Sequence, residues 1–272
     1  MTADDPRDIL RALATLPDAA FPLAEGALAL AAIDRPQVPL DRYRAHLDEL
    51  VETVAPAGAD GPARVAALAA AIAGSHRYQG DALTYDDLQN ANMIRVMDRR
   101  KGLPVALGIL YLEVARRLGW AASGLSFPGH FLVSVAGEGG RAILDPFHGG
   151  RTCDAAGLRR LLKSVAGEGE ELDPAHYAPV SNRQVLLRLH NNVKLRRMRG
   201  GDAAGALAAL EAMLLFAPDE GPLWHESGLL NAHLGNLRAA ADAIAAALAR
   251  TPEEAGRHHL ATLLQELRSR LN

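Results

Sequence analysis

The chain has 272 residues, of which 49% are hydrophobic and 22% are charged, so it can bury a real core in one large domain or two modest ones. Its formal net charge is -3 and it has no long basic run, which disfavours nucleic acid and anionic lipid as partners. The single cysteine, Cys153, excludes an internal disulfide and a structural zinc site built on cysteines.

The first eight residues are acidic where a secretion signal would be basic, and the longest apolar stretches are too short to cross a membrane. A single cysteine also makes no demand for an oxidising compartment. We therefore expect a cytoplasmic protein without a membrane partner.

Residues 1–98 are expected to form short helices separated by proline and glycine. Residues 41–51 place Tyr43, Leu47 and Leu50 on one stripe of an amphipathic helix. An alanine-rich helix is expected over residues 62–73, and a third helix over residues 85–99.

The strongest helix prediction covers residues 104–118. Pro104 suits the first helical position, and Gly119 follows a cationic last turn, as at many helix ends. Three short strands are expected after it, near residues 121–127, 130–136 and 141–145, with a glycine-rich turn at residues 137–140. A helix followed by an antiparallel meander predicts an α+β fold.

The C-terminal part is predicted to be wholly helical and internally repeated. Identical or similar residues recur at a spacing of 34: Gly201 and Gly235, Asp202 and Asn236, Ala206 and Ala240, Leu210 and Ile244, and Pro218 and Pro252. This period is typical of tetratricopeptide repeats. We expect two repeats, the first degenerate, and a closing helix over about residues 252–271. Two repeats are too few for an independent solenoid, so we expect them to pack against the preceding domain.

Four segments together resemble a known family: residues 90–104, residues 111–119, the run Phe127-Pro128-Gly129-His130-Phe131-Leu132-Val133, and Leu144-Asp145-Pro146-Phe147. They are similar to the transglutaminase-like domain of the bacterial SirB-type family. Residues 177–192 resemble the junction into that family's tetratricopeptide-like tail. The resemblance covers about residues 40–255.

The resemblance implies a papain-like, transglutaminase-type core, in which a central helix packs on an antiparallel sheet. In active relatives a cysteine nucleophile enters that helix, with a histidine on one strand and an aspartate on the next. Here His130 and Asp145 match the histidine and the aspartate, whereas Pro104 takes the place of the cysteine. Arg100 and Gly102 align with the motif before it, and no residue from Gly102 to Ala106 is nucleophilic.

Without a nucleophile, His130 and Asp145 cannot carry out acyl transfer by the usual triad. They are either a retained general-base pair or a hydrogen bond that ties two strands together. Cys153 is an alternative nucleophile, against a plain packed or loop thiol. His130, Asp145 and His148 have ligand-type side chains, but spacings of fifteen and three match no recognised zinc pattern. We predict no metal and no cofactor.

A candidate binding pocket comprises Asn90, Asn92, Arg100, Gly102 and Pro104. Arg100 and the backbone N–H groups of the helix start can hold a carboxylate or phosphate. Alternatively, Asn90 and Asn92 cap local helices while Arg100 pairs with a surface acid.

We predict three parts: N-terminal helices and a transglutaminase-like core over residues 1–162, a connector over residues 163–181, and tetratricopeptide-like repeats over residues 182–272. The favoured function is non-catalytic, a binding or regulatory module for a protein or peptide partner. The alternative is an atypical hydrolase or transferase acting on amide or ester bonds through His130 and Asp145.

Overall fold

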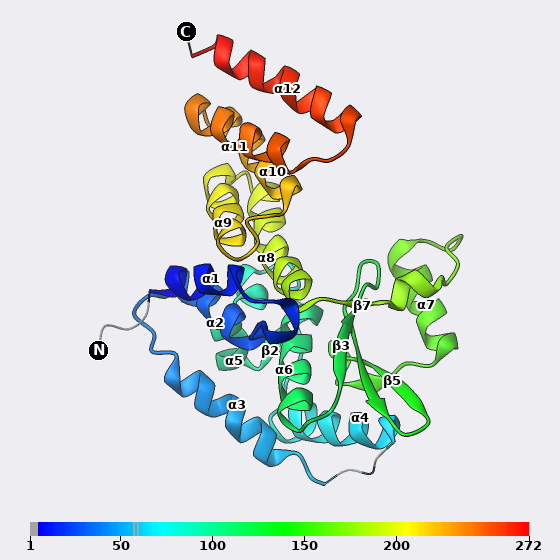
Figure 1. The fold of residues 1–272 in the computed structure, drawn as a ribbon. Helices are drawn as coiled ribbons and strands as arrows, with labels where there is room; N and C mark the ends of the chain where they lie inside the picture. Colours follow the sequence, from blue (N-terminus) through cyan, green and yellow to red (C-terminus); the bar gives the residue numbers. More distant parts are fainter. Residues whose placement is uncertain (1–4, 57, 59, 272) are drawn as a thin grey trace. The chain divides into compact units, whose positions relative to one another are not determined.

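The computed structural model describes residues 5–56, 58 and 60–271 and separates them into two compact units. One unit comprises residues 17–189, and the other combines residues 5–16 with residues 190–271 (Figure 1). These units divide the chain differently from the boundaries expected at residues 162 and 182. The first helix groups with the repeats, and the division falls inside α8 (Asn182–Arg199). The outermost residues of the expected ranges, 1–4 and 272, lie outside the described residues.

The unit of residues 17–189 is built around α6 (Pro104–Arg117), which is buried along most of its length. The helices before α6 are α2 (Leu23–Ile33), α3 (Asp41–Thr53), α4 (Gly61–Ala69) and α5 (Met93–Arg99). All four of these helices contact α6. Pro104 occupies the first turn of α6 and Gly119 adopts a φ of +76° just beyond its end, so the helix predicted over residues 104–118 is confirmed.

A five-stranded sheet packs on α6, with the strand order β6-β5-β4-β3-β7 and antiparallel neighbours throughout (Figure 1). Its strands are β3 (Ala122–Leu125), β4 (Leu132–Gly137), β5 (Gly140–Asp145), β6 (Arg151–Thr152) and β7 (Pro179–Val180). The three predicted strands correspond to β3, β4 and β5. The prediction of a central helix on an antiparallel sheet is confirmed.

A separate two-stranded parallel sheet lies at the start of α6. It pairs β1 (Gln79–Gly80) with β2 (Lys101–Gly102). Gly80 also donates its N–H to the carbonyl of Phe147, 3.1 Å away, and a Cβ at Gly80 would lie 2.4 Å from the Phe147 ring. Glycine is therefore required where the segment before α6 meets the turn after β5.

The helix predicted over residues 85–99 is shorter than expected. Residues Leu88–Ala91 form a 3-10 turn, and α5 begins only at Met93. Asn92 separates the two segments with an extended backbone, and its side-chain oxygen accepts the N–H of Arg95 at 3.2 Å. Asparagine is a preferred N-cap residue, so the helix begins after Asn92 although the apolar pattern starts earlier.

The segment expected as a connector contains ordered structure. Helix α7 (Ala155–Ala166) extends into it, and its Leu158 and Leu162 pack with Leu125, Phe127 and Leu132 of the sheet region. Further on, β7 pairs with β3, and the Ser126 hydroxyl donates to the carbonyl of Ala175 at 2.5 Å. The C-terminal half of the connector is therefore docked on the sheet.

The second unit contains α1 (Pro6–Ala14), the end of α8, α9 (Ala203–Phe216), α10 (Gly221–His233), α11 (Leu237–Arg250) and α12 (Glu254–Ser269). Its turns repeat at the spacing of 34. Gly201 and Gly235 have φ values of +75° and +80°, and the next residues, Asp202 and Asn236, donate N–H groups to Arg197 and Asn231. Equivalent hydrogen bonds at equivalent positions show that the sequence repeat is a structural repeat.

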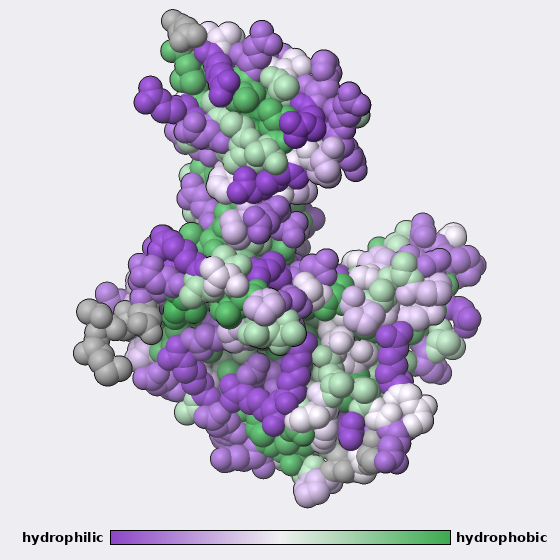
Figure 2. All heavy atoms as spheres, in the orientation of Figure 1, coloured by the Kyte–Doolittle hydropathy of each residue, from purple (hydrophilic) through white to green (hydrophobic). Residues whose placement is uncertain are grey.

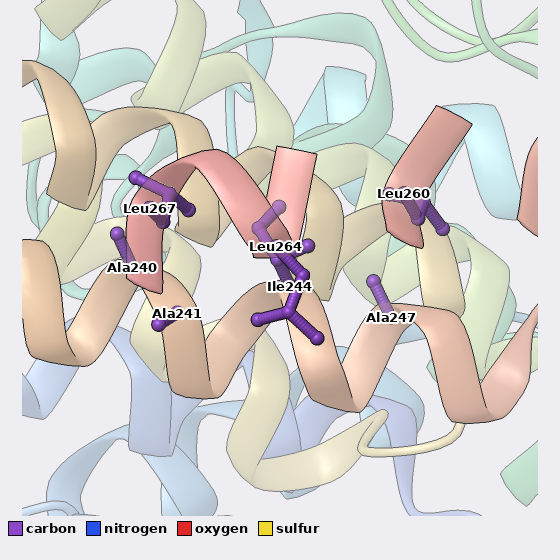
Figure 3. Packing of buried hydrophobic residues seen from close by; sticks show 7 residues of the cluster. All are labelled: Ala240, Ala241, Ile244, Ala247, Leu260, Leu264 and Leu267. Carbon is purple, nitrogen blue, oxygen red and sulfur yellow. The ribbon is translucent and has the colours of Figure 1, made fainter. Parts of the chain in front are cut away.

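The repeat helices pack closely through small residues. A Cβ at Gly228 on α10 would lie 2.4 Å from Ile244 on α11, so this contact requires glycine. On its other side α11 packs against α12, as Figure 3 shows for Ala240, Ala241, Ile244, Ala247, Leu260, Leu264 and Leu267. The closing helix therefore covers an apolar face that the last repeat would otherwise expose.

Hydrophilic side chains cover much of the face shown in Figure 2, with apolar side chains in patches between them. Among the described residues, no helix combines the length and the apolar character needed to cross a membrane.

Candidate functional site

Backbone hydrogen bonds connect the residues at the start of α6 to the segment before it. Leu103, the residue before the helix, donates its N–H to the carbonyl of Asn90 at 2.9 Å, and the Gly102 carbonyl accepts the N–H of Asp81 at 3.2 Å. Pro104 then occupies the first turn and has no N–H to offer. Pro104, which the resemblance places at the cysteine position, is thus buried at a helix start.

His130 and Asp145 form the predicted pair. The Nε2 of His130 lies 2.9 Å from Oδ1 of Asp145, and both side chains are buried. His130 lies just before β4, and Asp145 ends β5, so antiparallel pairing of these strands brings the two residues together. The two side chains are therefore within hydrogen-bond distance, although His130 precedes β4 instead of lying on a strand as predicted.

A second imidazole completes the group. The Nδ1 of His148 lies 2.7 Å from Oδ2 of Asp145, and the rings of His148 and His130 stack with centroids 5.9 Å apart. The side chain of His148 is 44% exposed, in contrast to the buried side chains of His130 and Asp145. One carboxylate therefore bridges two histidines, one buried and one open to solvent.

Backbone groups fix the orientation of this carboxylate. The N–H groups of Phe147 and His148 donate to Oδ1 of Asp145 at 3.0 and 3.3 Å. Burial raises the pKa of Asp145, but its hydrogen bonds and charge interactions with His130 and His148 outweigh that effect and lower the pKa overall. Asp145 is therefore held as an anion.

Tyr111 on α6 is a buried neighbour of this group. Its hydroxyl has no hydrogen-bond partner among the described residues, and it would lie 2.6 Å from a Cβ at Gly150. Burial and the negative charge of Asp145 both raise the pKa of Tyr111, so its hydroxyl stays protonated. A donor without a partner therefore lies within electrostatic reach of the bridging carboxylate.

Aromatic residues and one arginine surround His130. Its ring meets the Phe147 ring edge to face with centroids 6.1 Å apart, and Phe147 in turn meets Tyr85. Arg188 on α8 donates to the carbonyl of Phe127 at 2.8 Å and also to that of His130. This arginine positions the loop that carries His130.

The structure gives the pocket residues Asn90, Asn92 and Arg100 other partners. The Asn90 amide donates to the Thr84 carbonyl at 2.6 Å, and its oxygen accepts from Arg99 at 3.0 Å. Asn92 caps α5, as the structural alternative for that residue predicted.

Arg100 has a left-handed backbone conformation, with φ +58°, at the end of α5. Its guanidinium contacts His46 and the Tyr78 hydroxyl. These are uncharged or weakly basic partners instead of the surface acid that the structural alternative named. Asn90, Asn92 and Arg100 thus each have a separate set of contacts, and a shared binding role stays a prediction.

Pro104 lies one helical turn before Gly108 on the same face of α6. A Cβ at Gly108 would lie 2.4 Å from the ring of Phe131, the residue after His130. The helix start and the His130 loop are thus neighbouring parts of the fold. We predict that Pro104 faces the imidazole of His130.

The structure offers no support for Cys153 as a nucleophile. Its thiol lies 3.9 Å from the carbonyl of Arg151, and burial together with the charge of Asp145 raises its pKa to about 11. A reactive cysteine needs the opposite shift, toward the thiolate at neutral pH. The plain packed-thiol interpretation fits these observations.

Several residues of the site were not singled out from the sequence. Arg99 donates to Asp81 at 2.7 Å as well as to Asn90, and hydrogen bonds from Thr84 and Arg99 lower the pKa of Asp81 to about 2. Arg188 and Tyr111 were also missed. One sequence signal could have identified Arg99. Arginines stand at both positions 99 and 100, so either side chain could have been predicted to contact Asn90.

Comparison with known proteins agrees with this architecture. The model of the transglutaminase-like superfamily matches residues 41–191, more than half of the chain. The chain belongs to the transglutaminase-like superfamily. The tetratricopeptide repeat model matches residues 193–265. The predicted transglutaminase-like family and the tetratricopeptide-like C-terminal region are thus confirmed.

Among its relatives, a UPF0162 protein of Xylella fastidiosa is 31% identical over 231 residues, covering 82% of each chain. The protein SirB1 of Salmonella typhimurium is 28% identical over 141 residues, 52% of each chain. The human F-box only protein 21 is 31% identical over 165 residues, which cover 58% of this chain and 26% of that protein. No solved structure gave a significant match.

Proposed function

We propose that this transglutaminase-like protein is a non-catalytic binding module and that its repeat unit binds a protein or peptide partner. The absence of a nucleophile from Gly102 to Ala106 supports the non-catalytic part. The His130–Asp145 hydrogen bond then stabilises the fold. The proposal places the protein in the cytoplasm, consistent with its single cysteine.

The observation that carries the binding role is an apolar groove between α8 and α10. Its walls include Leu195 and Met198 of α8 and Leu229 of α10, which are 40%, 48% and 46% exposed. Large apolar side chains that line one hollow in this way mark an interaction site on a soluble protein. The hollow has a volume of about 560 Å³, enough for the anchor side chains of a peptide.

An ion pair joins α8 and α10 among the residues that line this groove. Lys194 is buried and its Nζ contacts Glu226 on α10. Lys194 takes the place that Gly228 has 34 residues later, where a Cβ would lie 2.4 Å from Ile244 on α11. The first repeat therefore carries a long charged side chain at the position where the second repeat requires glycine.

Selection from a phage-displayed peptide library tests the proposal. The full-length protein should enrich peptides with apolar anchor residues, and a Met198→Glu, Leu229→Glu double variant should lose those peptides. Leu271→Glu is the matched control, because Leu271 is 44% exposed at the end of α12 and lies outside the groove. Recovery of the same peptides with the double variant would contradict the proposal.

A further inference from the structure

The group formed by His130, Asp145 and His148 has the composition of a metal site. Each residue offers one ligand atom, and these three atoms all lie within 4.8 Å of one another. Two imidazole nitrogens and one carboxylate oxygen form a donor set that suits zinc and related divalent ions. The sequence spacings of fifteen and three residues match no recognised zinc motif, but the fold brings the three side chains together.

From this geometry we infer that His130, Asp145 and His148 bind one divalent transition-metal ion, with zinc as the best match. This site goes beyond the proposed binding function, which uses the repeat unit. The described residues that line the groove between α8 and α10 do not include His130, Asp145 or His148.

Charge supports the inference. Asp145 is fully buried, and its ion pairs in the described part of the chain are with these two histidines. A buried carboxylate needs a compensating positive charge or a full set of hydrogen bonds. The N–H groups of Phe147 and His148 and the two imidazoles already contact this carboxylate, and a divalent ion would take the place of the imidazole contacts and supply positive charge between the same three side chains.

The support around the ligands is also in place. Backbone N–H groups from Phe147 and His148 hold Oδ1 of Asp145 in orientation, which is the role of outer contacts at metal sites. The His130 and His148 nitrogens lie 2.9 and 2.7 Å from Oδ1 and Oδ2 of Asp145, at hydrogen-bond distance. A small outward movement of the imidazoles would bring them to the separation of about 3.4 Å expected between tetrahedral ligands of zinc.

His148 gives a metal ion a route to the site and can move to complete the coordination. Its side chain is 44% exposed and borders a hollow of about 680 Å³ that is also lined by Arg151 and Cys153. An ion can therefore enter without opening the core, and the exposed ring can move to close the set of three. Three protein ligands leave a coordination position for water, and the Tyr111 hydroxyl is a nearby buried donor that still lacks a partner among the described residues.

A second group, His46, Glu49 and His76, meets the same distance criterion. There, however, the guanidinium of Arg100 contacts His46 directly, and its positive charge repels a cation. This contact makes the second group the weaker candidate, and it supplies a matched control.

Zinc titration of the metal-free, full-length protein, followed by calorimetry and by competition with a chromogenic chelator, tests the inference. We expect one zinc ion per chain, and at least about tenfold weaker binding in His148→Ala. The exposed position of His148 makes loss of folding in this variant unexpected, and its thermal melt checks this. His46→Ala should bind zinc as the wild type does.

Nuclear magnetic resonance of the histidine side chains gives an independent readout, in which zinc should shift the signals of His130 and His148. The inference is overturned if His148→Ala keeps the wild-type affinity, if His46→Ala is the variant that loses it, or if zinc leaves both signals unchanged.

Discussion

The ring of Phe131 lies directly over Gly108, at a point where a Cβ on α6 would come within 2.4 Å of it. The same ring lies against Gly124 of β3, where a Cβ would come within 2.6 Å. Two glycines therefore make room for one aromatic ring, and that ring is the neighbour of His130 in the chain. The packing of α6 on the sheet thus fixes the position of the His130 loop.

Gly108→Ala tests this packing, because two effects oppose each other. Alanine favours an exposed helix over glycine by about 1 kcal/mol, but forcing a methyl group against the Phe131 ring costs about 1–3 kcal/mol. We expect a net loss of stability, measured by chemical unfolding. Gly74→Ala is the control, since Gly74 is exposed in a helical segment and the new Cβ would lie 3.9 Å from the carbonyl oxygen of Ala69. Equal or greater stability in Gly108→Ala would contradict the packing argument.

Cys153 should react slowly with electrophiles. With its pKa raised to about 11 by burial, roughly one molecule in 10⁴ carries the thiolate at pH 7. Iodoacetamide labelling, followed by mass spectrometry, should therefore be about 100-fold slower than for a free thiol of ordinary pKa. His130→Ala should leave the rate unchanged. Rapid labelling that disappears in His130→Ala would instead make Cys153 a nucleophile served by that histidine.

Much of the fold could be predicted because its main elements carry long-range patterns. The helix at residues 104–117 has a proline start, a glycine stop and an unbroken apolar body, and the repeats carry a period of 34. The two-residue strands β6 and β7 carry no pattern, because alternation needs several residues to be visible. Asn92 shows the other limit, since one N-cap side chain makes the helix begin at Met93, later than the predicted start at residue 85.

The candidate site was predictable only where strand pairing determined it. His130 and Asp145 meet because β4 and β5 are antiparallel neighbours, and the sequence order implied as much. Arg100 could not be placed in the same way. Its left-handed backbone at the end of α5 decides the direction of its side chain, and nothing in the sequence signals that conformation in a non-glycine residue.

His190 on α8 should make the repeat unit sensitive to acid. Burial lowers its pKa from 6.5 to about 4, so the folded protein holds this imidazole neutral while the unfolded chain protonates it. The stabilisation is complete above pH 6.5 and is lost as the pH falls toward 4, by up to about 3 kcal/mol. His190→Leu should remove this part of the pH dependence, whereas His258→Leu, at an exposed position, should not. Parallel stability curves for the wild type and His190→Leu between pH 7 and 4 would refute the assignment.

The N-terminal helix α1 should stabilise the repeats although it lies far from them in the sequence. It packs against α9, and its Leu10 is fully buried. Removing a buried leucine side chain costs about 2–5 kcal/mol, so Leu10→Ala should lower the melting temperature of the repeat unit, whereas Arg7→Ala at an exposed position should not.

Two fragments test the same contact without a point mutation. Residues 182–272 lack α1 and should melt at a lower temperature than a version in which residues 1–16 are joined to them through a flexible linker. We predicted that the repeats need the rest of the protein for stability, and this comparison tests whether α1 alone supplies that stability. If the short fragment melts cooperatively at the temperature of the linked version, α1 is dispensable and two repeats with their closing helix are enough to fold.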